Sequence, residues 1–246
     1  QLAAKSAPDG YTALIVDLAF YSNPSLVSKL PYDSVRDFAP VVSLASSASV
    51  LVVHPSVPVK NLKELIALAK ARPGELHYSS GGNGTSTHLA GELLKNAAGI
   101  NLIHIPYKGV APALTDTLAG QITITFAGVN AVRGFIETGK LRALGITGAR
   151  RNNAVPLVPT FAEAGLPGLD ATTYRGLLAP AGTPTEAITK LNAEFNKALA
   201  HAPLRTRLAE LGYDAAGGTV DEYAKLVRSE ISKWEGVIRK AGIRIE

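Results

Sequence analysis

The feature that most constrains the fold is an alternation of strand-like and helix-like segments along most of the chain. Apolar runs typical of strands occupy residues 11–20, 51–57, 75–80, 100–109, 121–128, 140–147 and 173–182. Segments with helical periodicity lie between them, at residues 61–74, 110–120 and 130–139, and two long helices close the chain. This alternation indicates an α/β architecture, and we expect parallel strands.

Three of the predicted helices begin with the residue spacing of a capping box, in which a polar N-cap precedes an acidic residue by three positions. The pairs are Asn61 with Glu64, Thr183 with Glu186, and Thr219 with Glu222. Pro184 is expected at the first helical position, where its missing N–H costs nothing. These starts place the two long helices after Thr183 and after Thr219.

Composition excludes several classes of function. The chain has 246 residues, of which 46% are hydrophobic and 18% charged, so it can form a sizeable core. It has no cysteine, which removes thiol nucleophiles, disulfides and thiolate metal sites. The histidines show no metal-ligand spacing, and no nucleophile–base motif is present. We therefore expect no catalytic residues, no metal and no enzymatic activity.

The charge pattern argues against nucleic acid as a partner. Net charge is +5, with 25 basic and 20 acidic residues scattered through the predicted helices. Such scatter is typical of solvated helix faces, whereas nucleic-acid sites gather basic and aromatic residues together. No apolar run is long enough to span a bilayer. There is also no methionine, so we expect Gln1 to follow a processing or cutting point.

A loop rich in glycine and hydroxyl side chains joins a strand to a helix in the stretch HYSSGGNGTSTHLAGELLK, residues 77–95. The first amides of a helix have no intrahelical partner, and the helix dipole adds partial positive charge there. Glycines 81, 82 and 84 allow the backbone to approach a ligand, and the hydroxyls of Ser80, Thr85 and Ser86 can donate hydrogen bonds. The loop therefore suits an anion such as a carboxylate or a phosphate.

Two other interpretations of this loop apply. Thr85 or Ser86 is expected to cap the following helix, which does not exclude ligand binding. The loop lacks the lysine of a P-loop and the third glycine of a dinucleotide fingerprint. The missing lysine favours a carboxylate held by neutral donors over a polyphosphate.

Seven blocks in the sequence, in order, carry a resemblance to a known family. They are APDGYTALI, KLPYDSVRDFAPV, residues 51–95, IHIPYKGVAPALTDTLAGQI, GKLRALGITGARR, VPTFAEAGLPG and GLLAPAGTPTEAITKLN. Together they resemble the periplasmic solute receptors of tripartite tricarboxylate transporters, the Bug or TctC family, over nearly the whole chain. The resemblance implies a two-lobed α/β fold of the type II periplasmic-binding-protein kind, with a ligand cleft between the lobes.

The resemblance also implies how the chain is divided. Residues 1–46 and 170–246 are expected to form lobe one, and residues 47–169 to form lobe two. Family members usually begin with more residues, so we expect a further segment, containing the first strand and first helix of lobe one, to precede Gln1.

The resemblance maps a set of candidate ligand-binding residues onto this sequence. The loop from residue 80 to residue 86 matches the segment that holds a ligand carboxylate, and FAGVNA, residues 126–131, matches another turn that faces the cleft. Many relatives have Asp-Asn where this chain has Ala-Gly, which disfavours an amino-acid ligand. The candidates are Ser80, Gly81, Asn83, Gly84, Thr85, Ser86, Phe20, Ser22, Ala127, Gly128 and Tyr174.

The function that the resemblance implies is that of a periplasmic receptor. It would bind a small organic carboxylate, without a cofactor, and deliver it to the membrane permease subunits of a tripartite tricarboxylate-type transporter. The alternative is an effector-sensing domain of a transcription regulator, since such domains share this type of fold. That alternative requires an upstream helix-turn-helix.

Overall fold

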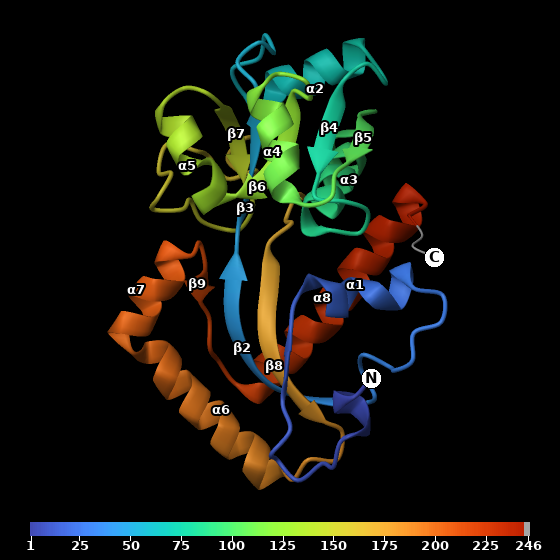
Figure 1. Ribbon diagram of the computed structural model, residues 1–246, viewed down its shortest axis with the longest axis vertical. Helices are drawn as coiled ribbons and strands as arrows, with labels where there is room; N and C mark the ends of the chain where they lie inside the picture. The colour runs from blue at the N-terminus through green and yellow to red at the C-terminus, as the bar shows by residue number, and fades with distance from the viewer. Residues whose placement is uncertain (244–246) are drawn as a thin grey trace. The chain divides into compact units, whose positions relative to one another are not determined.

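The computed structural model describes residues 1–243, which form two compact units. Unit 1 comprises residues 1–47 and 173–246 of the chain, of which residues 1–47 and 173–243 are described, and unit 2 comprises residues 48–172. The chain thus leaves unit 1 after Ser47 and re-enters it at Thr173. Each unit has its own sheet with helices packed on it (Figure 1). None of the helices in the described residues is long and apolar enough to cross a membrane.

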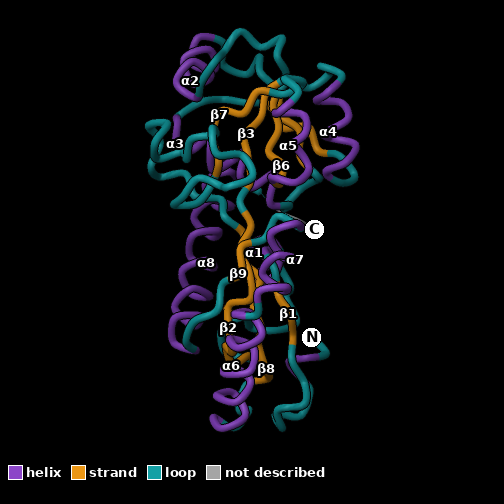
Figure 2. Tube along the Cα trace, turned by 90° about the vertical axis from the view of Figure 1, so that its left-hand side faces the viewer, coloured by secondary structure: helices purple, strands orange, loops and turns teal. Residues whose placement is uncertain are grey.

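Unit 1 is built on a four-stranded antiparallel sheet in the order β1-β8-β2-β9. Its strands are β1 (Leu14–Val16), β2 (Phe38–Ser47), β8 (Thr173–Pro180) and β9 (Asp214–Ala215). Its helices are a short 3-10 turn (Ala3–Lys5), α1 (Leu18–Leu26), α6 (Thr185–Ala200), α7 (Ala202–Glu210) and α8 (Val220–Ala241). Figure 2 shows α6 and α8 running beside these strands.

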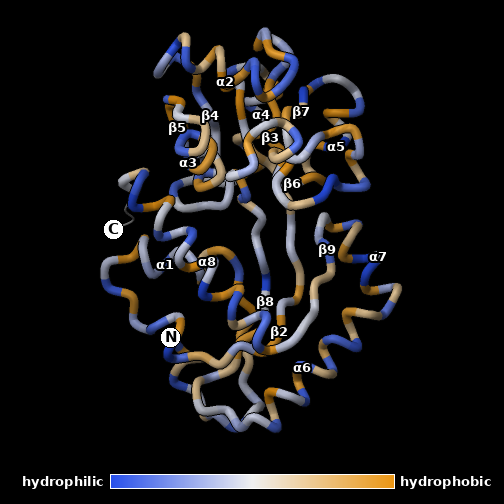
Figure 3. The backbone as a smooth tube through the Cα atoms, turned by 180° about the vertical axis from the view of Figure 1, so that it is seen from behind, coloured by the Kyte–Doolittle hydropathy of each residue, from blue (hydrophilic) through white to orange (hydrophobic). Residues whose placement is uncertain are grey.

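Alternate residues of β8 face different helices, as the pleat of a strand requires. Leu177 packs in an apolar cluster with Ile188 of α6. Gly176 instead faces α8, because a Cβ built on it would lie 1.9 Å from the Tyr223 hydroxyl. That hydroxyl lies 3.1 Å from the hydroxyl of Tyr21 on α1. The alternating colours of α6 in Figure 3 show the amphipathic pattern that lets it cover one side of the sheet.

Unit 2 is built on a five-stranded mixed sheet in the order β5-β4-β6-β3-β7. Its strands are β3 (Ser49–Val53), β4 (His77–Ser80), β5 (Ile103–Pro106), β6 (Ile124–Gly128) and β7 (Arg142–Ile146). Its helices are α2 (Leu62–Ala71), α3 (Ser86–Ala98), α4 (Val110–Leu118) and α5 (Val129–Glu137). Figure 2 shows α2 and α3 on one side of this sheet and α4 and α5 on the other.

The expectation of parallel strands holds for only part of the fold. Strand β4 is parallel to both β5 and β6, because α3 and α4 return the chain to the same edge before each new strand. Strand β3 is antiparallel to both of its neighbours, and every pairing in unit 1 is antiparallel. The fold is mixed α/β rather than all-parallel.

Three local predictions were wrong. Residues 11–20 do not form one strand, because the Asp17 carboxylate accepts the Ala19 N–H at 3.0 Å and starts α1 after three residues of β1. Pro184 is the N-cap of α6 rather than its first helical residue. The Thr183 hydroxyl donates to the Pro180 carbonyl at 2.8 Å and so does not cap α6. The capping box at Thr219 and Glu222 is confirmed.

Candidate functional site

Three helices of unit 2 begin at the same edge of its sheet. Strands β5, β4 and β6 are parallel neighbours, with Tyr78 opposite both His104 and Ile124. Each of these strands leads into a helix: β5 and β4 through a turn into α4 and α3, and β6 directly into α5. Because the carboxyl ends of parallel strands meet at one edge, the three helix N-termini gather there, which is where α/β sheets place their ligands.

None of these three helices is capped by a side chain. The N-cap residues of α4 and α5 are Gly109 and Gly128, which carry no acceptor. The N-cap residue of α3 is Thr85, but its side chain makes no capping bond. The positive ends of three helix dipoles therefore meet at this edge, and the first-turn amides of α3 have no partner among residues 1–243. The exposed Lys108, in the turn before α4, adds a formal positive charge.

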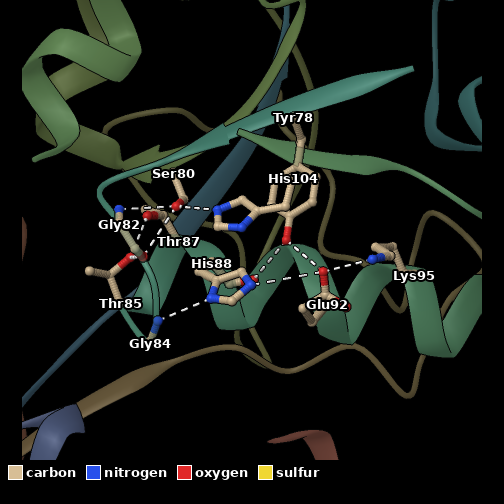
Figure 4. A network of polar contacts seen from close by, with 10 residues as sticks. All are labelled: Tyr78, Ser80, Gly82, Gly84, Thr85, Thr87, His88, Glu92, Lys95 and His104. Atoms are coloured by element: carbon tan, nitrogen blue, oxygen red, sulfur yellow. Dashed lines mark hydrogen bonds and ion pairs between the residues drawn. The ribbon is translucent and has the colours of Figure 1, made fainter. Parts of the chain in front are cut away.

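The Thr85 hydroxyl is used within the loop instead, which differs from the expected cap. It donates to the Gly82 carbonyl at 2.7 Å and lies 3.2 Å from the Thr87 hydroxyl. The Thr87 oxygen accepts the Gly81 N–H at 2.9 Å. The Ser80 oxygen accepts the Gly82 N–H at 3.0 Å. These bonds, drawn in part in Figure 4, tie the loop to itself.

The internal bonds change which groups remain for a ligand. Ser80 and Thr85 were expected to offer hydroxyls, and Gly81 and Gly84 amides, but all four groups are bonded inside the protein. Within residues 1–243, no protein partner is found for the side chain of Asn83, for the hydroxyl of Ser86 or for the amides of the first turn of α3. The donors that remain for a ligand therefore lie mainly at the start of α3 rather than within the loop.

Glycine is required at the bend of the loop. Gly82 has φ of 123°, a left-handed conformation that side chains rarely adopt. A Cβ there would also lie 3.0 Å from the Tyr107 carbonyl oxygen. The Tyr107 N–H donates to the Ser80 carbonyl at 3.0 Å, and the Gly109 N–H donates to the Gly81 carbonyl at 3.1 Å. The turn after β5 thus holds the loop after β4.

A buried polar cluster supports the loop from below (Figure 4). The Glu92 carboxylate accepts the Tyr78 hydroxyl at 2.8 Å and the Lys95 ammonium at 2.7 Å. The His88 ring lies 3.9 Å from the His104 ring between centroids, with 7° between their planes. Burial lowers the pKa of His88. The pKa of His104 is lowered to about 4, mainly by burial and to a lesser extent by electrostatic repulsion from His88 and Lys95. Both rings are therefore neutral at pH 7.

Sequence reasoning missed this cluster. The histidines were considered only for metal-ligand spacing and for nucleophile–base motifs, and this applied to His88 as well. Its spacing of four from Glu92 was a usable signal, because residues at i and i+4 share one helix face. His104 alternates with the apolar residues of β5, which placed it on the same side of the sheet as its neighbour Tyr78.

The other candidate residues lie in two places. Ala127 is buried in the apolar core of unit 2, and Gly128 is exposed at the carboxyl end of β6, the same edge as the loop. Phe20 is buried against Tyr32 and Phe38 in unit 1.

The remaining two candidates also belong to unit 1. The Ser22 hydroxyl donates to the Leu18 carbonyl at 3.0 Å inside α1. Tyr174 lies on β8, with the Lys233 ammonium 6.0 Å from its ring centroid. A role for these residues in ligand binding stays a prediction. Among residues 1–243, no group of three or more His, Cys, Asp or Glu residues is placed to hold a metal ion.

Comparisons with known proteins identify the family. Residues 1–243 match the sequence model described as the tripartite tricarboxylate transporter family receptor. A protein from Pseudomonas sp. strain P51, named for the tcbD–tcbE intergenic region, is 40% identical over 238 residues, which is 96% of this chain and 71% of that protein.

Two solved structures with bound acids are similar to this chain. Rpa4515 of R. palustris with adipate has a TM-score of 0.82 and 34% identity, and the match covers 99% of this chain and 82% of that one. MatC of Rhodopseudomonas palustris with bound malate has a TM-score of 0.77 and 32% identity, over 96% and 82% of the two chains. The chain belongs to the family of tripartite tricarboxylate transporter receptors.

Proposed function

We propose that this protein is a periplasmic receptor that binds a small organic carboxylate at the carboxyl edge of β5, β4 and β6. It delivers that acid to the membrane permease subunits of a tripartite tricarboxylate-type transporter. The observation that carries the proposal is the convergence of three helix N-termini without side-chain caps at this one edge.

The donors in the loop between β4 and α3 favour a carboxylate over a phosphate ester. The loop between β4 and α3 contains no lysine or arginine, and its open donors are neutral amides, one amide side chain and one hydroxyl. A carboxylate carries one negative charge on two oxygens, which two or three N–H groups can satisfy. A phosphate ester or polyphosphate carries more charge and usually requires a cationic side chain.

Two solved relatives support the ligand class, since their structures contain adipate and malate, both of which are small dicarboxylic acids. Family members are periplasmic binding proteins, which supports both the compartment and a role in transport. The proposal includes no chemical step. Ligand and permease are its partners, and no cofactor is required.

Calorimetric titration of the protein with adipate, malate, benzoate and citrate tests the proposal. We expect at least one of these acids to bind with micromolar or tighter affinity, and the matched neutral compound, such as adipamide for adipate, to show no heat of binding. No binding across the panel, or equal binding of acid and amide, would rule the proposal out. Delivery is tested by uptake of the labelled acid into cells with and without the receptor.

A further inference from the structure

His88 occupies the position in α3 where a capping box would place its acidic residue. Thr85 is the N-cap, so His88 is the third helical residue. The residue is 5% exposed, and its side chain reaches back along the chain, so that Nδ1 accepts the Gly84 N–H at 3.0 Å. The bond resembles the returning half of a capping box but reaches one residue before the N-cap, since the Thr85 N–H donates to the Gly82 carbonyl at 3.3 Å instead.

The other half of the box is missing, and this leaves donors open. In a capping box the N-cap side chain accepts the amide of the third helical residue. Here the Thr85 hydroxyl donates to Gly82 instead, and no capping bond is made. The His88 amide and the amides of Ser86 and Thr87 therefore have no hydrogen-bond partner among residues 1–243. The turn is fixed without consuming the donors that a ligand would use.

The bond to Gly84 requires one protonation state of the His88 ring. A backbone N–H can only donate, so Nδ1 must carry a lone pair and the proton must be on Nε2. A proton on Nδ1 would set two donors against each other. The groups that face the ring are the Glu92 carboxylate at 4.0 Å from Nε2, the parallel His104 ring of β5, and, through their contacts with Glu92, Lys95 and Tyr78.

We propose that His88 is a positioning residue for carboxylate binding, whose unprotonated Nδ1 holds Gly84 and so keeps the first-turn amides of α3 arranged for the ligand. This inference rests on the proposed function. It extends that function by naming a buried residue that acts on the ligand only through the backbone of the loop.

Two substitutions distinguish the role of the Nδ1 acceptor from the role of the ring in packing. His88→Phe keeps a ring of similar size against His104 and removes the acceptor. His88→Asn removes the ring but keeps an oxygen at the distance from the backbone where Nδ1 now lies. If the ring acts only as packing, Phe is the milder change. If it positions the loop, Asn is the milder change.

The first measurement is made on the ligand-free protein by nuclear magnetic resonance. We expect the ¹⁵N signals of the wild-type His88 ring at pH 7 to show a neutral ring protonated on Nε2. We expect hydrogen exchange at the Gly84 amide to be about tenfold faster in His88→Phe and close to wild type in His88→Asn, since one hydrogen bond of ordinary strength is lost or kept. An Nδ1-protonated ring would overturn the inference.

The second measurement is the affinity for adipate, or for whichever acid of the panel binds wild type most tightly. We expect His88→Phe to weaken binding about tenfold and His88→Asn to restore most of that loss. Equal affinities of wild type and His88→Phe, or stronger binding by His88→Phe than by His88→Asn, would overturn the inference while leaving the proposed function standing. Absence of binding by wild type would overturn the proposed function itself.

Discussion

The rings of His88 and His104 lie parallel, with centroids 3.9 Å apart and 7° between their planes, beneath the loop that follows β4. Two imidazoles at this distance cannot both take up a proton without strong repulsion. His104 also lies within hydrogen-bonding distance of the loop, with its Nε2 2.6 Å from the Ser80 oxygen. The pair therefore links the protonation state of the core to the conformation of the loop.

Stability should fall as the pH falls from about 6.5 toward 4. Burial holds the pKa of His104 at about 4, against 6.5 for a free imidazole, and lowers the pKa of His88 as well. In that window the unfolded chain takes up protons that the folded chain refuses, so the folded state loses relative stability. We expect a loss of roughly 2 kcal/mol by pH 4, allowing for solvent screening of the half-buried His104, measured as the free energy of unfolding in urea.

Two variants test whether His104 causes this loss of stability at low pH. His104→Gln keeps a polar group near Ser80 and removes the titrating ring, so its stability should change less between pH 6.5 and 4.5 than that of wild type. His201→Gln, at an exposed position between α6 and α7, is the matched control and should keep the wild-type slope. If both variants keep that slope, His104 is not its source.

Gly91 should be essential for the packing of α3 on the sheet. A Cβ on this residue would lie 2.1 Å from Cε2 of the buried Tyr78 ring, so Gly91→Ala forces the ring or the helix to move. We expect a loss of about 2 kcal/mol in the free energy of unfolding. Gly134→Ala is the matched control, since Gly134 is also helical, is exposed and has open space at its Cβ.

The control substitution should change the free energy of unfolding in the opposite direction. Alanine is the better helix former, so Gly134→Ala should raise stability by about 0.5–1 kcal/mol. Urea unfolding of both variants by circular dichroism checks the pair. A Gly91→Ala protein as stable as wild type would mean that Tyr78 does not pack against α3 as the structure has it.

The sequence carries enough information for the strand–turn–helix order of unit 2 but less for unit 1. Residues 11–20 are mostly apolar, with Asp17 as their one charged residue. In such a short run, periodicity cannot distinguish a strand from a buried helix. The distinction depends on the Asp17 carboxylate accepting the Ala19 N–H, a bond that forms only once the chain has turned. The same holds for Pro184, whose place at the N-cap follows from the turn at Thr183.

The candidate site could be predicted as a location but not as a set of atoms. Glycines beside a helix start indicate an anion site, and the family resemblance points to the same loop. Which donors stay open depends on the side chains of Thr85, Thr87 and His88, each of which has several acceptors or donors within reach. Composition and spacing do not choose among such alternatives, because the choice depends on three-dimensional distances.

Lys108 should assist binding through charge alone. It is exposed in the turn before α4, at the same edge as the loop. Given the proposed function, we expect Lys108→Ala to weaken adipate binding about threefold at low ionic strength and to have less effect in 0.5 M salt, since exposed charges are screened. Calorimetric titrations at the two salt concentrations check this.

Lys70 provides the matched control for that charge. It is exposed in the last turn of α2, which leads to the amino end of β4 and so to the opposite edge of the sheet. Lys70→Ala should leave affinity unchanged at both salt concentrations. A loss of affinity equal to that in Lys108→Ala would indicate a general effect of net charge rather than a local one.

The amide of Ser86 gives the most direct test of the donors at the start of α3. Ser86 is the first helical residue, and Thr85 before it has φ of −71° and ψ of 163°, a conformation that a following proline accepts. Proline is well tolerated at this position, because the N–H that it removes has no intrahelical partner. Ser86→Pro should therefore delete a ligand donor without destabilising the helix.

We expect Ser86→Pro to weaken binding of adipate, or of the tightest acid in the panel, by about tenfold or more relative to Ser86→Ala, which loses only the hydroxyl. Thr185→Pro makes the same change at the exposed first residue of α6 and should leave affinity unchanged. Calorimetry measures affinity and thermal unfolding confirms that all three variants remain folded. If Ser86→Pro binds the acid as tightly as Ser86→Ala, the Ser86 amide does not contact the carboxylate, and the ligand must be held by other donors at this edge.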